Sequence, residues 1–551
     1  MISIGIFSKD FNNLSNLEYR FYEWCKKQEW INIKVFLIDG RNIKKQHILK
    51  KIFNFNIFSK LLFICINKID IIFNDYTKVD QNKKNEIIEW LKNHSKLIIK
   101  PIKRKGNIDY FDENLKKEIS KYNLDIILRF DLEIIKGNIL KSIKYGIWSF
   151  HHADNDINRG GPAGFWEVYL KQKITGVTLQ RLNDQLDGGE IIEKGYYPTQ
   201  PTFFRNNSFI IEKSLTILIK NIKLINNNSI IFTKSKKYNK KIYKYPTDFK
   251  TIFKYLLIIL RNTLIKKIIY KFYYILNYHL HHWTIYIANT KNFFEIDLNK
   301  SYEIKTKNKE FYADPFFINK NNKDYLFFEN FNYNNSKGSI ACATIDNNQL
   351  YDKKIILNKN YHMSYPFIFE ENNNIYLLPE MSQAMKQDIY KVVEFPYKWE
   401  LYKTLFKNQF SADPTIYKDQ NFNFWLFINQ SQDPYNDLNS ELYIYKILNF
   451  ETFNLIPHKR NPVIIDSRRA RNAGSIFTWN KKIIRPSQNS NSEAYGNSLN
   501  FYEIIKLDIN NYEEKFIYNL NFNTINRNII GTHHYSLFKD KSIIDICFKN
   551  Y

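Results

Sequence analysis

The sequence lacks the features of a secreted or membrane-spanning chain. No uncharged apolar run reaches the ~18 residues of a membrane-spanning helix, and the N-terminal segment MISIGIFSKDF has neither the basic start nor the long apolar stretch of a signal peptide. The four cysteines, Cys25, Cys65, Cys342 and Cys547, form no CxxC pair, so the sequence supports neither a zinc site nor a disulfide framework. We therefore expect a cytoplasmic protein in a reducing compartment, with no bound metal.

Proline and glycine are also scarce, with 14 and 16 residues among 551. Apolar residues make up 44% of the chain and aromatic residues 17%, which excludes a disordered or collagen-like protein. A single hydrophobic core stops growing near ~250–300 residues. The length therefore predicts two globular domains and a connector.

Acidic residues are fewer than basic residues. The chain contains 81 Lys and Arg and 55 Asp and Glu, which gives a formal net charge of +26. Clustered basic residues can bind nucleic acid or anionic membranes. These lysines are scattered along the whole chain, and Asn, Ile, Tyr and Phe are also abundant, as AT-rich codons would make them. We therefore favour a solvated lysine surface and consider a nucleic-acid partner unlikely.

The N-terminal third alternates short apolar runs with amphipathic stretches, as in the βαβ units of an open, mostly parallel sheet. These segments are 3–7, the helix-like 17–28, 31–39, 61–73, 124–130 and 145–152. Ligands of such sheets bind beyond the C-terminal ends of the strands. We therefore expect a functional site directly after YGIWSF (145–150).

A basic segment follows at residues 236–284. Up to Trp283 it contains eleven Lys or Arg and only one acidic residue, Asp248. Its apolar part, 253–280, predicts one or two helices with lysines too frequent for a membrane span. A basic amphipathic helix can lie on an anionic membrane surface, here the inner membrane. Alternatively, the segment is a connector whose apolar face packs on a neighbouring domain.

The region after Trp283 contains a loose fivefold repeat of paired strands. The pairs are 312–318 with 324–330, 364–370 with 374–380, 411–417 with 422–429, 472–477 with 481–488, and 532–538 with 541–548. Repeats of this length suit one four-stranded blade each, so residues 285–551 are predicted to form a five-bladed β-propeller. Positions Asp314, Tyr365, Asp413, Gly474 and His533 should then converge around one axis.

Two polar stretches of the N-terminal domain can carry chemistry, SFHHADNDINRGGPAGFWEV (149–168) and TGVTLQRLNDQLDGGEII (175–192). A histidine and a carboxylate at the rim of a sheet, such as His151 and Asp187, can act as a general-base pair. A hydrogen-bonded core histidine and a common Asp-Gly-Gly turn would give the same pattern. Metal binding by His151, His152 and Asp154 is disfavoured, because adjacent residues of a strand point to opposite faces.

Residues 149–192 resemble the signature of the formyltransferases that use 10-formyltetrahydrofolate, which include methionyl-tRNA and sugar N-formyltransferases. That family carries an Asn-x-His strand end, a basic-Gly turn and a Leu-Asp-x-Gly-[Asp/Glu] loop. His151 matches the histidine, Arg159-Gly160 the turn and residues 186–190 the loop, while Ser149 replaces the asparagine. Segment 128–140 is similar to the part of the family that lines the pterin pocket, and the resemblance spans about residues 1–230.

The resemblance implies a role for each matching residue. His151 would take the proton of the attacking amine, Asp187 would position His151, and Ser149 with backbone donors would hold the carbonyl oxygen. The remaining assignments are Arg129, Phe130, Gly188 and Gly189 to the folate, and Asp154 and Arg159 to the acceptor.

Most of residues 285–551 resembles the N-terminal domain of plant glucosamine inositolphosphorylceramide transferases and, more distantly, five-bladed glycoside hydrolases. The matching phrases include YADPFF, YHMSYPFIFE, SADPTIY and RRARNAGSIF. The resemblance implies that Asp314, Asp413 and Glu380 bind substrate. A glycosidase pair with Glu380 or Glu493, carbohydrate binding, and a structural role all remain open, and Tyr365, Trp425 and Tyr495 would suit sugar stacking.

The sequence therefore predicts a formyltransferase-like catalytic domain at residues 1–235, a basic helical connector at 236–284 and a propeller at 285–551. The predicted reaction transfers a formyl group from 10-formyltetrahydrofolate to the amine of an amino sugar or glycan precursor. The alternatives are an enzyme like methionyl-tRNA formyltransferase, and a non-catalytic carbohydrate-binding or assembly protein with a degenerate transferase site.

Overall fold

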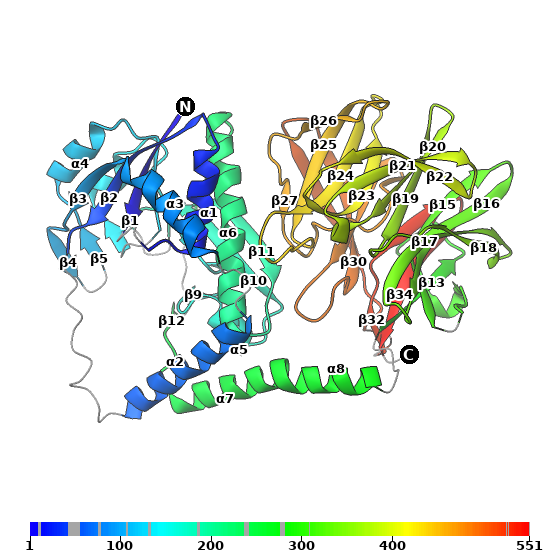
Figure 1. Cartoon of the computed structure of the whole chain (residues 1–551), viewed down its shortest axis with the longest axis horizontal. Coiled ribbons are helices and arrows are strands. Elements are labelled where there is room, and N and C mark those ends of the chain that lie inside the picture. The colour runs from blue at the N-terminus through cyan, green and yellow to red at the C-terminus, as the bar shows by residue number, and fades with distance from the viewer. Residues whose placement is uncertain are drawn as a thin grey trace. The chain divides into compact units, whose positions relative to one another are not determined.

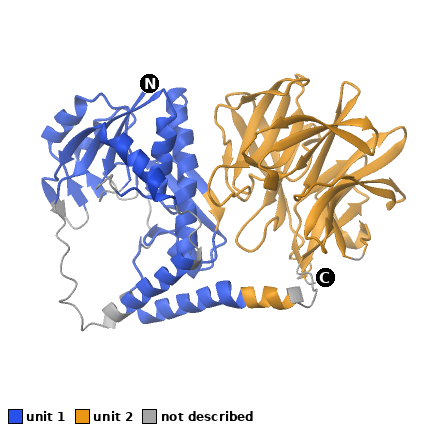
Figure 2. Ribbon diagram, viewed as in Figure 1, with its two compact units in different colours: residues 1–195, 199–266 blue, residues 196–198, 267–551 orange. Residues whose placement is uncertain are grey.

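The computed structural model divides into two compact units, residues 1–195 with 199–266 and residues 196–198 with 267–551 (Figure 2). It describes residues 1–8, 13–41, 55–74, 79–105, 108–130, 134–184, 188–235, 242–275, 281–307, 309–524, 526 and 528–549. For residues 55–58, 60, 73–74, 104–105 and 274–275 only the backbone is described.

The first unit is built on a seven-stranded sheet (Figure 1). In spatial order its strands are β11 (Glu190–Pro198), β10 (Ile174–Arg181), β8 (Ile147–His151), β6 (Ile126–Arg129), β1 (Ile2–Ser8), β2 (Ile31–Asp39) and β3 (Ser95–Ile99). Strands β8, β6, β1, β2 and β3 run parallel, and β10 is antiparallel to β8. The parallel strands therefore all end at one edge of the sheet, where β8 brings Ser149 and His151.

Helices pack on this sheet because apolar residues of its strands alternate between the two faces. The helices of the unit are α1 (Asn16–Lys26), α2 (Phe55–Asn74), α3 (Gln81–Lys92), α4 (Glu113–Ser120), α5 (Phe165–Tyr169), α6 (Phe203–Asn226) and α7 (Phe249–Leu260). Val35 and Leu37 belong to the core shared with Ile119 of α4, whereas Phe36 meets Tyr22 of α1 edge-on at 5.9 Å. Helix α1 begins at a capping box formed by Ser15 with Glu18.

Short strands and helices complete this part of the chain. The strands are β4 (Lys103–Lys105), β5 (Ile108–Tyr110) and β7 (Ile134–Lys136) in one small sheet, and β9 (Arg159–Gly160) paired with β12 (Ile242–Tyr243) in another. A short helix, η2 (Asn138–Lys141), precedes β8, and α7 continues as η3 (Arg261–Ile265) and α8 (Lys266–Ile275). The apolar run 61–73, one of the segments of the predicted βαβ pattern, is helical and lies within α2.

The second unit consists of five antiparallel sheets, the blades of a propeller. Blade 1 is β15 (Glu310–Lys320), β16 (Lys323–Asn332), β17 (Lys337–Asp346) and β18 (Gln349–Leu357). Blade 2 is β19 (Ser364–Glu371), β20 (Asn374–Glu380), β21 (Gln387–Glu394) and β22 (Lys398–Leu405). Blade 3 is β23 (Phe410–Lys418), β24 (Phe424–Ser431), β25 (Glu441–Asn449) and β26 (Asn454–Pro457), with β27 (Ile464–Ile465) beside β25. Blade 4 is β28 (Phe477–Trp479), β29 (Lys482–Asn489), β30 (Ser498–Leu507) and β31 (Tyr512–Leu520).

Blade 5 combines the first and the last strands of the unit and so closes the ring. It contains β13 (His281–Ala288), β14 (Tyr302–Glu303), β32 (Ile529–Gly531), β33 (Tyr535–Phe538) and β34 (Lys541–Lys549). β13 pairs with β34 along its whole length, from His281 opposite Lys549 to Ala288 opposite Ser542. The domain start predicted at residue 285 therefore falls inside β13.

The innermost strands of blades 1 to 3 share a local distortion. Asp314, Tyr365 and Asp413 have positive φ angles of 52°, 45° and 47°, and each lies at a register shift against the second strand of its blade. Non-glycine residues rarely adopt this conformation, and bulges of this kind redirect a side chain, often beside functional sites. Gly474 has φ 115° at the corresponding place in blade 4.

The predicted fold class is confirmed, since an open, mostly parallel α/β sheet precedes a five-bladed propeller. The first three predicted strand pairs are antiparallel hairpins in their own blades. In blades 4 and 5 the first strand of the pair is shorter than predicted, since β28 begins at Phe477 and β33 begins at Tyr535. Among the described residues, no helix combines the length and the apolar character needed to cross a membrane.

Candidate functional sites

The first candidate site lies at the ends of the parallel strands β6 and β8. Ser149 is buried, and its Oγ accepts hydrogen bonds from Arg129 Nε at 3.0 Å and from Arg129 Nη2 at 2.8 Å. The carbonyl oxygen of Phe150 lies 3.5 Å from the hydroxyl, which is long for a hydrogen bond. The hydroxyl proton can therefore point to a ligand, while the guanidinium behind it adds positive charge.

His151 ends β8 two residues after Ser149. Its Nε2 lies 3.2 Å from the carbonyl oxygen of Asn158. An Nε2–H that donates to this carbonyl leaves Nδ1 as the basic nitrogen of the neutral ring. Asp187, the predicted partner of His151, lies outside the described residues, so its role stays a prediction.

Gln180 is a polar residue of this site that the sequence prediction missed. It lies on β10 directly opposite Ser149, so the two side chains share a face of the sheet. The residue is 4% exposed, and its Oε1 has no hydrogen-bond partner among the described residues. A Cβ added to Gly189 would lie 3.3 Å from that oxygen, so the predicted folate-binding glycine is adjacent. The antiparallel register of β8 and β10 was the signal that could have revealed Gln180.

A cavity of about 700 Å³ opens beside the loop that carries Gly188. Its lining includes apolar Leu140 and Ile143 and basic Lys144 and Lys234. Arg129 and Phe130 do not line it. Phe130 packs instead on α1, with its ring 5.5 Å from that of Phe21.

The remaining predicted residues of this unit support the turn after β8. Asp154 is buried, pairs with Lys194 at 2.5 Å and accepts a hydrogen bond from the backbone N–H of Asp156. Arg159 is buried in β9, which pairs with β12. Burial, with the charge of His151, lowers the pKa of His152 to about 4, so His152 is neutral at physiological pH.

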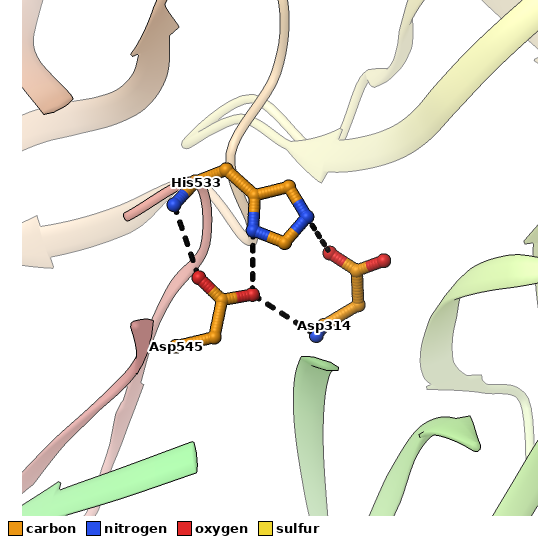
Figure 3. Close-up of side chains that lie close together, drawn as sticks. All are labelled: Asp314, His533 and Asp545. Carbon is orange, nitrogen blue, oxygen red and sulfur yellow. Dashed lines mark hydrogen bonds and ion pairs between the residues drawn. The ribbon is translucent and has the colours of Figure 1, made fainter. Parts of the chain in front are cut away.

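The second candidate site lies on the propeller axis and centres on Asp314, His533 and Asp545 (Figure 3). His533 Nδ1 lies 2.7 Å from Asp545 Oδ2, and its Nε2 lies 3.6 Å from Asp314 Oδ1. Burial alone would lower the pKa of His533, but Asp545 and Asp314 raise it to about 9. Burial would raise the pKa of Asp314, but His533 and His534 lower it to about 2. The buried imidazolium therefore bridges two carboxylates at neutral pH.

Ligand atoms of these three residues lie within 4.8 Å of one another, as in a metal site. The Asp545 carboxylate, however, already accepts the backbone N–H groups of His533, His534 and Asp314, at 3.0, 2.9 and 3.2 Å. A histidine must also lose its proton to bind a metal, and Asp545 and Asp314 favour the protonated form of His533. The arrangement therefore fits a hydrogen-bonded ion cluster better than a metal centre.

Arg471 joins the other two predicted acids of the axis. Its Nε donates to Asp413 Oδ2 at 2.7 Å and its Nη2 to Glu380 Oε2 at 2.9 Å. Burial raises the pKa of Asp413, Arg471 opposes this shift, and Glu380 adds to it. The two carboxylates therefore share one guanidinium.

Glu329 is a further axial acid that the sequence prediction did not include. Its Oε1 is buried without a hydrogen-bond partner among the described residues, and His362 Nε2 lies 3.5 Å away. Burial raises its pKa, and the charges of Asp314 and Glu380 raise it further. Glu329 lies opposite Ala313 in blade 1 as Glu380 lies opposite Ser364 in blade 2, so the repeat itself was a signal that could have identified it.

Tyr495 is the aromatic residue that the structure leaves accessible beside this cluster. Its side chain is 41% exposed, the Arg471 guanidinium lies 4.7 Å from its ring centre, and the His533 ring is 5.4 Å away. The prediction that Tyr365 and Trp425 also stack on sugars is wrong, because both are at most 2% exposed. The Tyr365 hydroxyl instead bonds to Thr415 inside the propeller.

The predicted convergence of the repeat positions is supported by their direct contacts. The Tyr365 N–H donates to Asp314 Oδ2 at 3.0 Å, and the Gly474 N–H donates to the Tyr365 hydroxyl at 2.9 Å. His533 contacts Asp314 from blade 5. Asp413 lies near the same axis, since its charge, like those of Asp314 and Glu380, raises the pKa of Glu329.

The charge of His533 predicts how propeller stability depends on pH. Its pKa is raised in the folded state, so its contribution is complete below its ordinary pKa of about 6.5 and is lost as the pH rises through about 9. A shift of this size corresponds to about 3 kcal/mol. We expect the melting temperature of the full chain to exceed that of a His533→Asn variant at pH 6, and this difference to shrink by pH 9.

Asparagine is the matched replacement because its Nδ2 can donate to Asp545 as Nδ1 does, without carrying a charge. Following the difference between the two proteins removes the titration of all other groups. A difference that stays constant from pH 6 to pH 9 would show that His533 is not charged in the folded protein.

Comparison with known proteins identifies relatives of the propeller. Residues 298–536 match the family described as glucosamine inositolphosphorylceramide transferase 1, N-terminal. Proteins of that name are 30% identical over 211 residues in Oryza sativa subsp. japonica and 31% identical over 209 residues in Arabidopsis thaliana. Each alignment covers 37% of this chain and 27% of the relative, so the chain spans about a quarter of the length of these curated relatives. The resemblance inferred for the C-terminal half is thereby confirmed.

Among solved structures, an N-formyltransferase from Helicobacter canadensis, in complex with folinic acid and dTDP-3-aminofucose, is similar at 14% identity with a TM-score of 0.30. The alignment covers 57% of this chain and 95% of that protein.

Proposed function

We propose that the first unit transfers a formyl group from 10-formyltetrahydrofolate to the amine of an amino sugar. The observation that carries this proposal is the pair formed by Ser149 and Arg129. The family asparagine would hold the carbonyl oxygen at this position, and a serine reaches less far. A hydroxyl that accepts two hydrogen bonds from a guanidinium becomes a stronger donor, and the cation favours negative charge beside it.

The other residues supply the remaining functions of such a site. His151, with Nε2 oriented by the Asn158 carbonyl, offers Nδ1 to take the proton of the attacking amine. Asp187, as the resemblance implies, would position this histidine and help relay protons. The proton taken from the amine would pass to N10 of tetrahydrofolate as the bond between N10 and the formyl carbon breaks. The nucleophile is the acceptor's own amine, so the reaction needs no nucleophilic side chain.

The residues near Ser149 fit a folate. The buried Gln180 Oε1 lacks a described partner and can accept an N–H of the ligand. The cavity beside Gly188 is lined by neither Ser149 nor Gln180 and also contains Asp184 and Glu190, but its apolar Leu140 and Ile143 and its basic Lys144 and Lys234 could hold another part of the ligand, such as a carboxylate tail. When bound, 10-formyltetrahydrofolate would supply the activated formyl carbon.

The propeller supports an amino sugar as the acceptor. The matching relatives are named for the transfer of glucosamine, a sugar with a free amine. The buried Oε1 of Glu329, which has no hydrogen-bond partner among the described residues, would bind a sugar hydroxyl or amine, and the accessible ring of Tyr495 would stack on a sugar face. A propeller that retains the amino sugar would raise its concentration for the first unit.

The test is incubation of the full chain with 10-formyltetrahydrofolate and a panel of nucleotide-linked amino sugars, read by mass spectrometry. We expect a product heavier by one carbonyl group on at least one amino sugar, and none on the matched N-acetylated sugar, whose nitrogen is not nucleophilic. Absence of product on every free amine, with folate bound to the protein, would contradict the proposal.

The exposed Tyr495 favours a second function, carbohydrate binding by the propeller independently of any transfer. We expect Tyr495→Ala to weaken binding of the full chain to hexosamines by about five- to tenfold, the cost of one lost stacking contact and its buried area. Isothermal titration calorimetry measures this effect. Tyr302→Ala, also in the propeller and 52% exposed, is the matched control. Equal affinity of the two variants would exclude Tyr495 from the binding site.

A further inference from the structure

The outer sides of α2 and of the helix formed by α7 and η3 carry an unusual number of exposed apolar residues. We call this surface the helical face. Its apolar members are Leu61, Ile64, Ile69 and Ile72 of α2 and Phe249, Phe253, Leu257, Leu264 and Ile265 of α7 and η3. Each is between 40% and 76% exposed. Contiguous apolar patches of this kind mark interaction sites on otherwise polar protein surfaces.

The sides of these helices opposite the helical face are buried in the core of the unit, and this burial holds the helices in place. Phe63 and Ile66 of α2 form one buried core with Ile252, Tyr255 and Ile258 of α7. Residues 249, 253 and 257 recur every four positions, which places them along one stripe on the side away from this core. The helical face is therefore a second apolar surface of these helices, separate from the core that the described residues form.

The exposed charges on these helices are all positive. Lys68, Lys250, Lys254 and Arg261 are exposed beside the apolar stripe. Residues 249–275 contain no Asp or Glu. The acid of α2, Asp70, is buried and accepts a hydrogen bond from the backbone N–H of Phe204 at 3.0 Å. The helical face therefore presents apolar and basic groups without a compensating carboxylate.

We propose that the helical face docks on an anionic membrane surface, with its apolar residues between the lipid head groups. A helix pair with one apolar stripe and flanking lysines matches the chemistry of such a surface, which offers hydrocarbon below and phosphate above. A protein partner would need an equally large apolar patch with acidic groups around it. The apolar and basic pattern continues along α8, where Ile268 and Phe272 are 66% and 59% exposed.

Docking would bring the first unit to the lipid–water boundary. An amino sugar carried on a lipid would meet the protein there, whereas a soluble amino-sugar nucleotide would not need the membrane. The proposal stands on the helical face alone and is tested without any measurement of formyl transfer, so failure of one does not decide the other.

The experiment follows binding of the full chain to vesicles. Cys65 is exposed on α2, while Cys25, Cys342 and Cys547 are buried, so an environment-sensitive fluorophore can be placed on Cys65. We expect a blue shift with vesicles of phosphatidylcholine and phosphatidylglycerol, weaker binding as salt increases, and little binding to phosphatidylcholine alone. A fluorophore on Asn335→Cys in a Cys65→Ser chain, at an exposed turn of the propeller, should show no shift.

Variants separate the two parts of the surface. Phe253→Glu with Leu257→Glu should reduce vesicle affinity by about tenfold or more for each side chain. Lys250→Gln should reduce it by about fivefold. The matched control is Leu401→Glu with Phe516→Glu, two propeller residues that are 54% and 52% exposed. Circular dichroism of each variant checks that the fold is kept.

Three results would overturn the proposal. They are the same affinity in the helical-face variant and in its control, equal binding to neutral and anionic vesicles, and no binding to any vesicle. Loss of a dimer in the Phe253→Glu, Leu257→Glu chain, measured by light scattering without vesicles, would also overturn it, since a second copy of the chain would then cover the helical face.

Discussion

A chain that begins at residue 289 and ends at residue 549 is expected to fail to fold, whereas a chain of residues 281–549 should form a propeller. The two differ only by strand β13, which pairs with β34 over all eight of its residues. Ile285 and Ile287 of this strand are buried in the core. Without β13 the ring loses its closing strand, and the apolar edge of β34 is open to pairing between molecules.

The measurements are far-ultraviolet circular dichroism, size-exclusion chromatography and urea unfolding of the two fragments. We expect one cooperative transition for 281–549, and aggregation or no transition for 289–549. Cooperative unfolding of both fragments at the same urea concentration would show that the ring does not depend on β13.

The largest expected effect on activity is that of His151→Ala, which should lower the rate of formyl transfer by about 10²- to 10⁴-fold, the usual contribution of a general base. Arg129→Met should lower it by about 10²- to 10³-fold, because Ser149 would lose the cation that polarises it. Both effects should appear in the rate at saturating acceptor, since these residues act on the transfer step.

His152→Gln is the matched control. His152 is the neighbouring residue, its ring stacks on Phe150 with centres 5.5 Å apart, and its lowered pKa keeps it neutral. It should keep most of the rate. Equal loss in His152→Gln and His151→Ala would indicate a general disturbance of the strand end, and a wild-type rate for His151→Ala would exclude the proposed base.

The local pattern of the sequence was sufficient for the propeller and for the order of the two units. Each hairpin joins strands about ten residues apart, so its signal lies within a short window, and five such windows repeat. Polar residues that end a buried strand, such as Ser149 and His151, were found for the same reason. Their position at the end of a strand follows from the local sequence and does not depend on how the rest of the chain folds.

The closing strand β13 could not be found this way, because its partner β34 lies at the other end of the propeller sequence. A strand that pairs with a partner distant in sequence, as β13 does when the ring closes, is not revealed by a local repeat. The same limit applies to the contacts of Arg129 with Ser149 and of Arg471 with Asp413, which join different strands or blades.

The sequence by itself determined the fold class, the strand pairs of the repeat and the residue types available for chemistry. Only the tertiary structure decided which of them meet and in what charge state. Glu329 and Asp314 are ordinary acids in the sequence, but burial raises the pKa of one while two histidines lower that of the other. The reason is physical, because the electrostatic free energy of a group depends on solvent exclusion and on charges brought near by folding, and neither is a property of the local sequence.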